Sequence, residues 1–68
     1  MNATEIKKHL NKPVIFRNKK AGIDSVYMFT GAIFRKGSDG YFYQAELQEM
    51  NGRRTIVICS LEDIYPTE

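Results

Sequence analysis

The sequence predicts a mainly β protein: a small, strongly bent antiparallel barrel with a short N-terminal helix and a one-turn helix near the C-terminus. Three observations lead to this prediction. Two β-type runs meet at Asn51-Gly52, a long apolar run is interrupted by Gly31, and 68 residues leave room for one small domain, residues 1–68. Closing a short, bent sheet into a barrel removes most of its unpaired edges.

Residues 41–61 predict the β-hairpin around which the rest of the chain is organised. Asn-Gly is the pair best suited to a two-residue type I′ turn, in which both residues adopt positive φ. The turn sets the predicted opposing pairs, which are Met50–Arg53, Glu49–Arg54, Leu47–Ile56, Ala45–Ile58 and Tyr43–Ser60. The predicted apolar face consists of Tyr41, Tyr43, Ala45, Leu47, Ile56 and Ile58. The predicted mixed face consists of Phe42, Gln44, Glu46, Gln48, Thr55, Val57, Cys59 and Leu61. A slip of one residue would exchange the two faces.

Residues 2–11 predict a short helix. Asn2 can cap its first turn, and Glu5, three residues further on, completes a capping-box pattern. Ala3, Ile6 and Leu10 fall on one helical face. Because a helix of this length is not stable alone, we expect this face to pack on the sheet. The proline at position 13 is expected to stop the helix.

The rest of the chain predicts short strands and tight connections. Residues 14–17 predict a first strand, residues 18–25 a polar loop and residues 26–36 a long second strand. Gly31 within that strand indicates a bulge or sharp bend, which would reverse the side chains that point inward. Residues 37–40 predict a hairpin loop. Residues 62–66 predict one helical turn that leads into a very short fifth strand, with Ile64 and Tyr65 closing the end of the barrel.

The composition argues against several classes of protein. A single cysteine, Cys59, cannot form an internal disulfide, and together with a single histidine, His9, it leaves too few ligands for an all-protein zinc site. No apolar run approaches the ~20 residues of a membrane span, and residues 1–10 do not resemble a secretory signal. We therefore expect a cytoplasmic protein that has no cofactor and does not contact a membrane.

The charges are unevenly distributed, although the net charge is only +2. Residues 1–36 carry eight Lys and Arg side chains against two acidic ones, whereas residues 37–68 carry two against six. This distribution could steer an acidic ligand. The two halves could equally attract each other within the fold or between subunits, or form an ordinary solvated surface.

The order of elements resembles the Sm-like layout of an N-terminal helix, five bent strands and a one-turn connector before the last strand. The resemblance is carried by Leu-Asn-Lys-Pro-Val-Ile-Phe at 10–16, Phe-Thr-Gly-Ala-Ile at 29–33, and Thr-Ile-Val-Ile-Cys-Ser-Leu-Glu-Asp-Ile-Tyr-Pro at 55–66. It implies an SH3-like or Sm-like barrel. In such a barrel, pairing through the edge of the fourth strand would give dimers or rings.

Three segments, at 29–36, 42–47 and 60–64, also resemble short uncharacterised accessory proteins encoded by bacterial phages and prophages. This resemblance implies the cytoplasm of a bacterial host and a role in engaging a host protein, which could include blocking a defence system. It supplies no catalytic residues.

Protein binding or self-association is the function that we expect. The candidate interface residues are Val57, Cys59, Leu61 and Phe42, all on the predicted mixed face. These apolar side chains need cover from the helix, from the first strand or from a second chain. If the helix covers them, the protein would be a monomer without an interface at this place.

Binding of a nucleic acid or a nucleotide is the alternative. Aromatic side chains on a small barrel can stack on bases while nearby cations contact phosphates. The candidate residues for this function are Arg35, Lys36, Tyr41, Arg53 and Arg54. Against it, most aromatic residues of so small a chain are needed in the core.

An enzymatic function is not expected. Cys59 and His9 are the one thiol–imidazole pair, but Cys59 lies in an apolar run, where cysteine commonly serves as a small hydrophobic residue. Glu62 and Asp63 are more typical of helix capping or solvation. Residues 37–40 lack the lysine and the following helix of a phosphate-binding loop.

Overall fold

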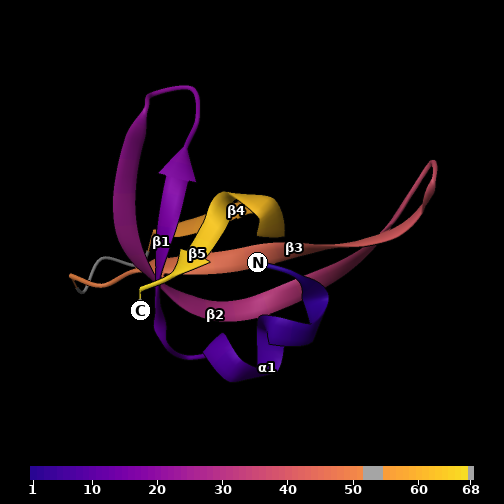
Figure 1. The fold of residues 1–68 in the computed structure, drawn as a ribbon, viewed down its shortest axis with the longest axis horizontal. Coiled ribbons are helices and arrows are strands. Elements are labelled where there is room, and N and C mark those ends of the chain that lie inside the picture. Colours follow the sequence, from indigo (N-terminus) through magenta and orange to yellow (C-terminus); the bar gives the residue numbers. More distant parts are fainter. Residues whose placement is uncertain (52–54, 68) are drawn as a thin grey trace.

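The computed structural model describes residues 1–51 and 55–67 of the chain. It consists mainly of five strands: β1 (Pro13–Asn18), β2 (Ile23–Gly37), β3 (Gly40–Glu49), β4 (Ile56–Ser60) and β5 (Ile64–Pro66). They form one antiparallel sheet with the order β4-β3-β2-β1-β5 (Figure 1). The mainly β prediction is therefore confirmed. Among the described residues the sheet ends at β4 and at β5 without closing, so its closure into a barrel is not confirmed.

The N-terminal segment covers the sheet as a short 3₁₀ turn, η1 (Ala3–Glu5), followed by α1 (Ile6–His9). The predicted capping box is present: Thr4 N donates to Asn2 Oδ1 at 3.1 Å, and Asn2 N donates to Glu5 Oε1 at 3.2 Å. The helical segment ends before the predicted position 11, because Asn11 has a φ of 62° and turns the chain toward β1. Ile6 and Leu10 pack against the core, as predicted, whereas Ala3 is exposed.

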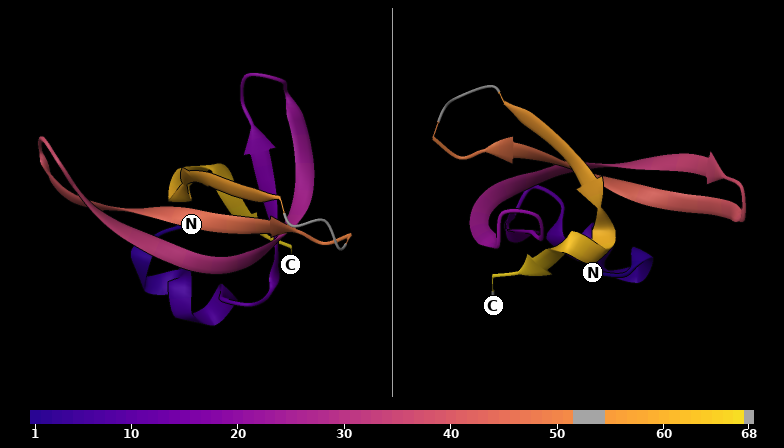
Figure 2. Two further views of the ribbon diagram at one scale, coloured as in Figure 1. Left: turned by 180° about the vertical axis from the view of Figure 1, so that it is seen from behind. Right: turned by 90° about the horizontal axis from the view of Figure 1, so that it is seen from above.

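The sharp bend of β2 gives the molecule its shape. The register of β2 against β3 shifts between Phe29 and Gly31, which confirms the predicted irregularity. Thr30 lies at the shift, and its hydroxyl donates to the side chain of Glu46 at 3.0 Å. A methyl group on Gly31 would lie 3.1 Å from Glu46 Oε2, so glycine fits this close approach. Because of the bend, the β1–β2 and β2–β3 hairpins project in different directions (Figure 2).

The predicted register of β3 against β4 is wrong by one residue. Leu47 lies opposite Val57 rather than Ile56, and Ala45 lies opposite Cys59 rather than Ile58. At this end of the hairpin β3 ends at Glu49, whose N–H donates to the carbonyl of Thr55 at 3.3 Å. The predicted pairs that involve Arg53 and Arg54, and the Gly52 position of the turn, lie outside the described residues.

This register has a physical reason at the other end of β4. The chain leaves β4 through Leu61, which begins the 3₁₀ turn η2 (Leu61–Asp63), and Leu61 and Ile64 are both buried. Side chains alternate along a strand, so a buried Leu61 requires Cys59 and Val57 to point inward as well. The predicted helical turn is present as η2 but ends at Asp63 rather than at residue 66, and the short fifth strand is present as β5 (Ile64–Pro66).

A small core lies between the bent sheet, the N-terminal segment of η1 and α1, and the η2 turn. Its buried members are Val14, Phe29, Ala45, Leu47, Cys59, Leu61 and Ile64. Six partly buried residues pack against it, namely Met1, Ile6, Leu10, Phe16, Tyr27 and Val57. A core of this size leaves much apolar surface outside it, and contiguous exposed apolar surface is typical of binding sites.

Candidate functional site

The outer half of the β2–β3 hairpin extends beyond the core, and we call it the aromatic arm (residues 33–44). In Figure 1 it projects to the right, away from α1, β1 and β5. Its strands remain paired up to Gly37 and Gly40, which are joined by Ser38 and Asp39. Gly40 has a φ of 119°, a conformation that suits glycine. The strands of the arm stay paired to its tip although the core does not reach it.

One face of the aromatic arm carries three aromatic rings. Phe34 lies opposite Tyr43, and Tyr41 follows on the same face of β3. The rings of Phe34 and Tyr41 stack at a centroid distance of 4.9 Å and an angle of 11°, and the ring of Phe34 lies 5.0 Å from that of Tyr43. Their exposed fractions are 58% for Phe34, 66% for Tyr41 and 38% for Tyr43. The three rings therefore form a packed cluster that remains open to solvent.

The opposite face of the arm carries a fourth aromatic ring. Phe42 is exposed, and its ring lies over Gly37, where an added methyl group would come within 3.0 Å of the ring. Glycine at this position thus allows the ring to rest on the backbone. The arm therefore presents exposed aromatic side chains on both of its faces.

Two cations lie on the same arm. Lys36 lies opposite Tyr41 and Arg35 lies opposite Phe42, so each face has one basic residue beside its aromatic residues. The Arg35 guanidinium donates a hydrogen bond to Gln44 Oε1. Three of the five predicted nucleic-acid-binding residues therefore lie on the arm: Lys36 and Tyr41 share one face, and Arg35 lies on the other. The other two, Arg53 and Arg54, lie outside the described residues.

The predicted protein interface is not assembled as a surface. Cys59 and Leu61 are buried at exposed fractions of 9% and 7%, and Val57 is partly buried against the same core. These three side chains are covered within the chain, as the sequence had left open. Phe42 is the one member of the predicted set that is exposed.

The slip in register explains this correction and shows what the sequence prediction missed. Because the faces of β4 are exchanged, Ile56 and Ile58 point away from the core and are exposed by 57% and 43%. Phe34 was also missed as a surface residue. The signal for it was its position only a few residues from the 37–40 loop, farther along the hairpin than so small a core can extend.

The thiol of Cys59 is not activated. Burial in the first place, and the charge of Asp63 in the second, raise the pKa of Cys59 from 9.0 to about 11. The thiol therefore keeps its proton at neutral pH, as expected for a small hydrophobic residue. His9 lines a small pocket that does not include Cys59.

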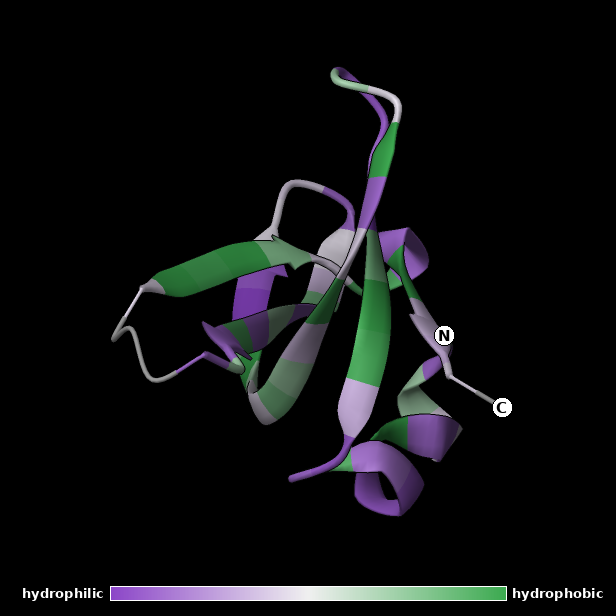
Figure 3. Cartoon of the chain, turned by 90° about the vertical axis from the view of Figure 1, so that its left-hand side faces the viewer, coloured by the Kyte–Doolittle hydropathy of each residue, from purple (hydrophilic) through white to green (hydrophobic). Residues whose placement is uncertain are grey.

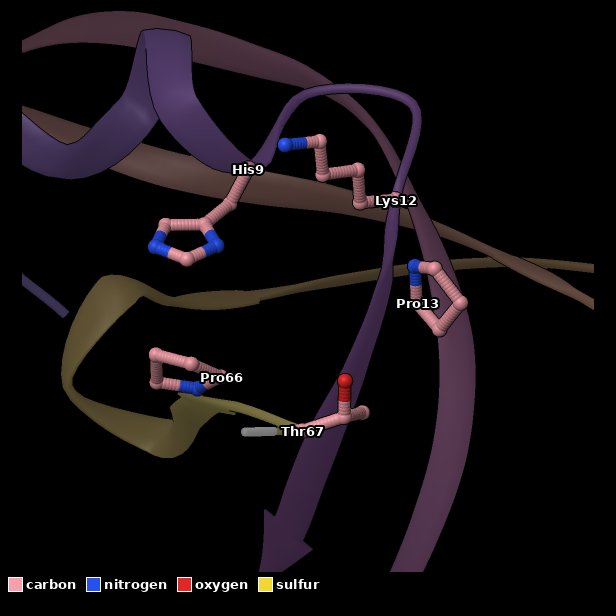
Figure 4. Close-up of a pocket in the computed structure, with 5 residues that line it drawn as sticks. All are labelled: His9, Lys12, Pro13, Pro66 and Thr67. Atoms are coloured by element: carbon pink, nitrogen blue, oxygen red, sulfur yellow. The ribbon is translucent and has the colours of Figure 1, made fainter.

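That pocket has a volume of about 150 Å³ and is lined by His9, Lys12, Pro13, Pro66 and Thr67. Figure 4 shows the side chains of His9 and Lys12 on one side of it and the ring of Pro66 on the other. It lies where the end of α1 meets β1 and β5. The described His, Cys, Asp and Glu side chains do not gather in a group of three that could hold a metal ion.

Ion pairs join some of the basic and acidic residues. Arg17 Nε lies 3.1 Å from Asp24 Oδ1, and the Arg17 guanidinium also lies over the ring of Tyr65 at 5.2 Å. The Asp24 carboxylate raises the pKa of Arg17. Lys19 Nζ lies 3.2 Å from Asp63 Oδ1, so the basic and acidic halves of the chain do contact each other within the fold.

Comparison of this chain with protein-family models, with curated proteins and with solved structures found no match. Within residues 1–51 and 55–67, the helices are too short and too polar to cross a lipid bilayer. The fold and the site therefore define a class, a small open β-sheet protein with a projecting aromatic hairpin.

Proposed function

We propose that this chain is a non-enzymatic binding module that docks on a protein partner through the aromatic arm. The observation that carries this proposal is the exposed ring cluster of Phe34, Tyr41 and Tyr43, placed on a paired hairpin beyond the core. Large aromatic side chains supply much of the energy of protein interfaces, and contiguous apolar surface outside a core is typical of them.

The shape of the arm fits this role. Because its strands are paired to the tip, the arm loses little conformational entropy on binding, and its rings are already packed in one arrangement. Aromatic residues on both faces suit insertion into a groove of a partner, where both sides of the hairpin would be buried. The cations on the arm would then lie at the rim of the contact.

The proposal also concerns the kind of module this chain is and the compartment in which it acts. The sequence resemblances support an SH3-like or Sm-like module of the phage accessory type, which acts on a host protein in the bacterial cytoplasm. A protein of a host defence system is one such partner.

The test is site-specific photo-crosslinking from the tip of the arm. A photoreactive amino acid replaces Ser38, and the products are compared between this chain and one that also carries Phe34→Ala and Tyr41→Ala. We expect a discrete crosslinked protein with the first chain and at least about tenfold less of it with the second. A matched control carries Ile23→Ala, an exposed apolar position on the other hairpin. Equal crosslinking by all three chains would contradict the proposal.

Binding of single-stranded nucleic acid is a second candidate, supported by the position of Lys36 on the face of the stacked rings and of Arg35 beside Phe42 on the opposite face. It predicts affinity for an oligonucleotide that decreases steeply with salt and is lowered by Lys36→Ala. An affinity that does not respond to salt or to this substitution would exclude the second candidate.

A further inference from the structure

The two edges of the sheet differ in a way that bears on assembly. β5 consists of three residues, and one of them, Pro66, has no N–H to donate. β4 consists of five residues, Ile56–Ser60, without a charge or a proline among them. Natural sheets usually protect an edge by short length, charges or proline, because an unpaired edge binds other strands. β5 is protected in this way and β4 is not.

The apolar character of β4 extends to its exposed side chains. Ile56 and Ile58 lie on the outer face at 57% and 43% exposure, while Val57 and Cys59 face the core. In Figure 3, β4 follows the grey segment and is hydrophobic along most of its length. Among the described residues, β4 is hydrogen-bonded to a neighbouring strand on one side only, the side of β3. An added strand would satisfy its outer backbone groups and place side chains beside both isoleucines.

We propose that β4 pairs antiparallel with β4 of a second copy of this chain, about a twofold axis at Ile58. This register overlaps all five residues: Ile58 lies opposite its own copy, Ile56 opposite Ser60, and Val57 opposite Cys59. Each pair joins residues of the same parity, so outer side chains meet outer side chains and the two sheets become one continuous sheet.

Two features favour a second β4 over other occupants. A head-to-tail contact would place β4 against β5, which is too short and lacks the N–H of Pro66. An uncharged strand also offers no charge pattern by which a different protein would be selected, whereas it is well matched to an equally uncharged strand. β4 of a second copy is such an uncharged strand.

The contact is small, so we expect a weak and reversible dimer. Five paired residues per chain are far fewer than the about 20–30 per side of a standard interface, and we expect a dissociation constant of about 10–100 μM. This inference does not rest on the proposed function of the aromatic arm, because β4 and the arm tip carry different residues.

Sedimentation velocity between about 10 μM and 1 mM protein tests the proposal, since this range brackets the expected dissociation constant. The wild type should change from its 7.8 kDa monomer to a dimer across the range. Ile58→Lys and Ile58→Glu should each remain monomeric, because like charges would meet at the axis. An equimolar mixture of the two variants should recover the dimer, since the lysine of one chain then faces the glutamate of the other across the axis.

The controls separate this contact from others. Ile23→Lys introduces the same charge at an exposed apolar residue outside β4 and should dimerise like the wild type. The Phe34→Ala/Tyr41→Ala chain should also dimerise, and loss of its dimer would assign self-association to the arm and overturn the inference. Circular dichroism and urea unfolding establish that each Ile58 variant is folded.

Three results would contradict twofold pairing at β4. They are a wild type that stays monomeric at every concentration, folded Ile58 variants that dimerise as the wild type does, and a mixture that stays monomeric while the wild type dimerises. The last result would point to a contact in which Ile58 does not meet its own copy.

Discussion

The inner face of the β2–β3 hairpin has a base and a tip that differ sharply. At the base, Phe29 lies opposite Leu47, and both are fully buried. At the tip, Phe34 lies opposite Tyr43 on the same face, and both are exposed by more than a third. The strands and the kind of side chain are alike. The difference is that α1, η2 and β5 cover the base and do not extend to the tip. Apolar side chains therefore stabilise the fold at the base and are available for binding at the tip.

The largest effect is expected from a substitution at the base. Phe29→Ala should destabilise the chain by about 3–5 kcal/mol, because it removes a large buried ring and leaves a cavity. Since a core this small supplies little more stability than that, we expect the variant to be largely unfolded. Circular dichroism and urea unfolding measure the effect. A folded, cooperative Phe29→Ala protein would show that the base is not the core.

A substitution at the tip should separate binding from stability. Removing the rings of Phe34 and Tyr41 together should reduce partner capture about tenfold or more while the fold is retained. The readout is a quantitative binding curve with the partner identified by crosslinking. Comparison with Val26→Ala, another exposed apolar position, shows whether the loss is specific to the arm.

Cys59 lies on β4 in the same core as the base and should make stability depend on pH above neutrality. Its pKa is raised from 9.0 to about 11, so the unfolded chain loses the thiol proton first as the pH rises. The folded state then binds more protons, and its stability contribution from this group decreases between pH 9 and about 11. Urea unfolding at several pH values should show a smaller decrease for Cys59→Ala. Parallel decreases in both proteins would contradict the assignment.

The smallest effect is expected at the bend between base and tip. Gly31→Ala places a methyl group 3.1 Å from Glu46 Oε2, which can move because it ends a flexible side chain. We expect a cost of about 1 kcal/mol or less, with the hydrogen bond from Thr30 weakened. Thermal unfolding measures the cost. A larger loss would show that the bend depends on the exact position of the Glu46 carboxylate.

Features set by local chemistry could be predicted from the sequence. The Asn2–Glu5 capping box, the irregularity at Gly31 and the one-turn helix after β4 are each set by neighbouring residues, and each was predicted. The register of β4 could not be, because it depends on burial of Leu61 and Ile64 at the far end of the strand rather than on Asn51 in the turn. That single slip moved Val57 and Cys59 into the core and Ile58 to the surface.

The candidate site was predicted only in part for the same reason. Arg35, Lys36 and Tyr41 were identified from their residue types and their nearness to the 37–40 loop. Phe34 was not, because an apolar residue on the inner face looks the same in sequence whether or not other elements cover it. Only the extent of the core in three dimensions distinguishes the two cases.

The most direct test of this account is the unfolding free energy of the Phe34→Ala/Tyr41→Ala chain, measured by urea denaturation beside the wild type. The account predicts a loss of at most about 1.5 kcal/mol, the value of an aromatic pair, with a cooperative transition retained. A loss as large as that of Phe29→Ala would place the rings in the core and contradict the assignment of the arm tip to binding.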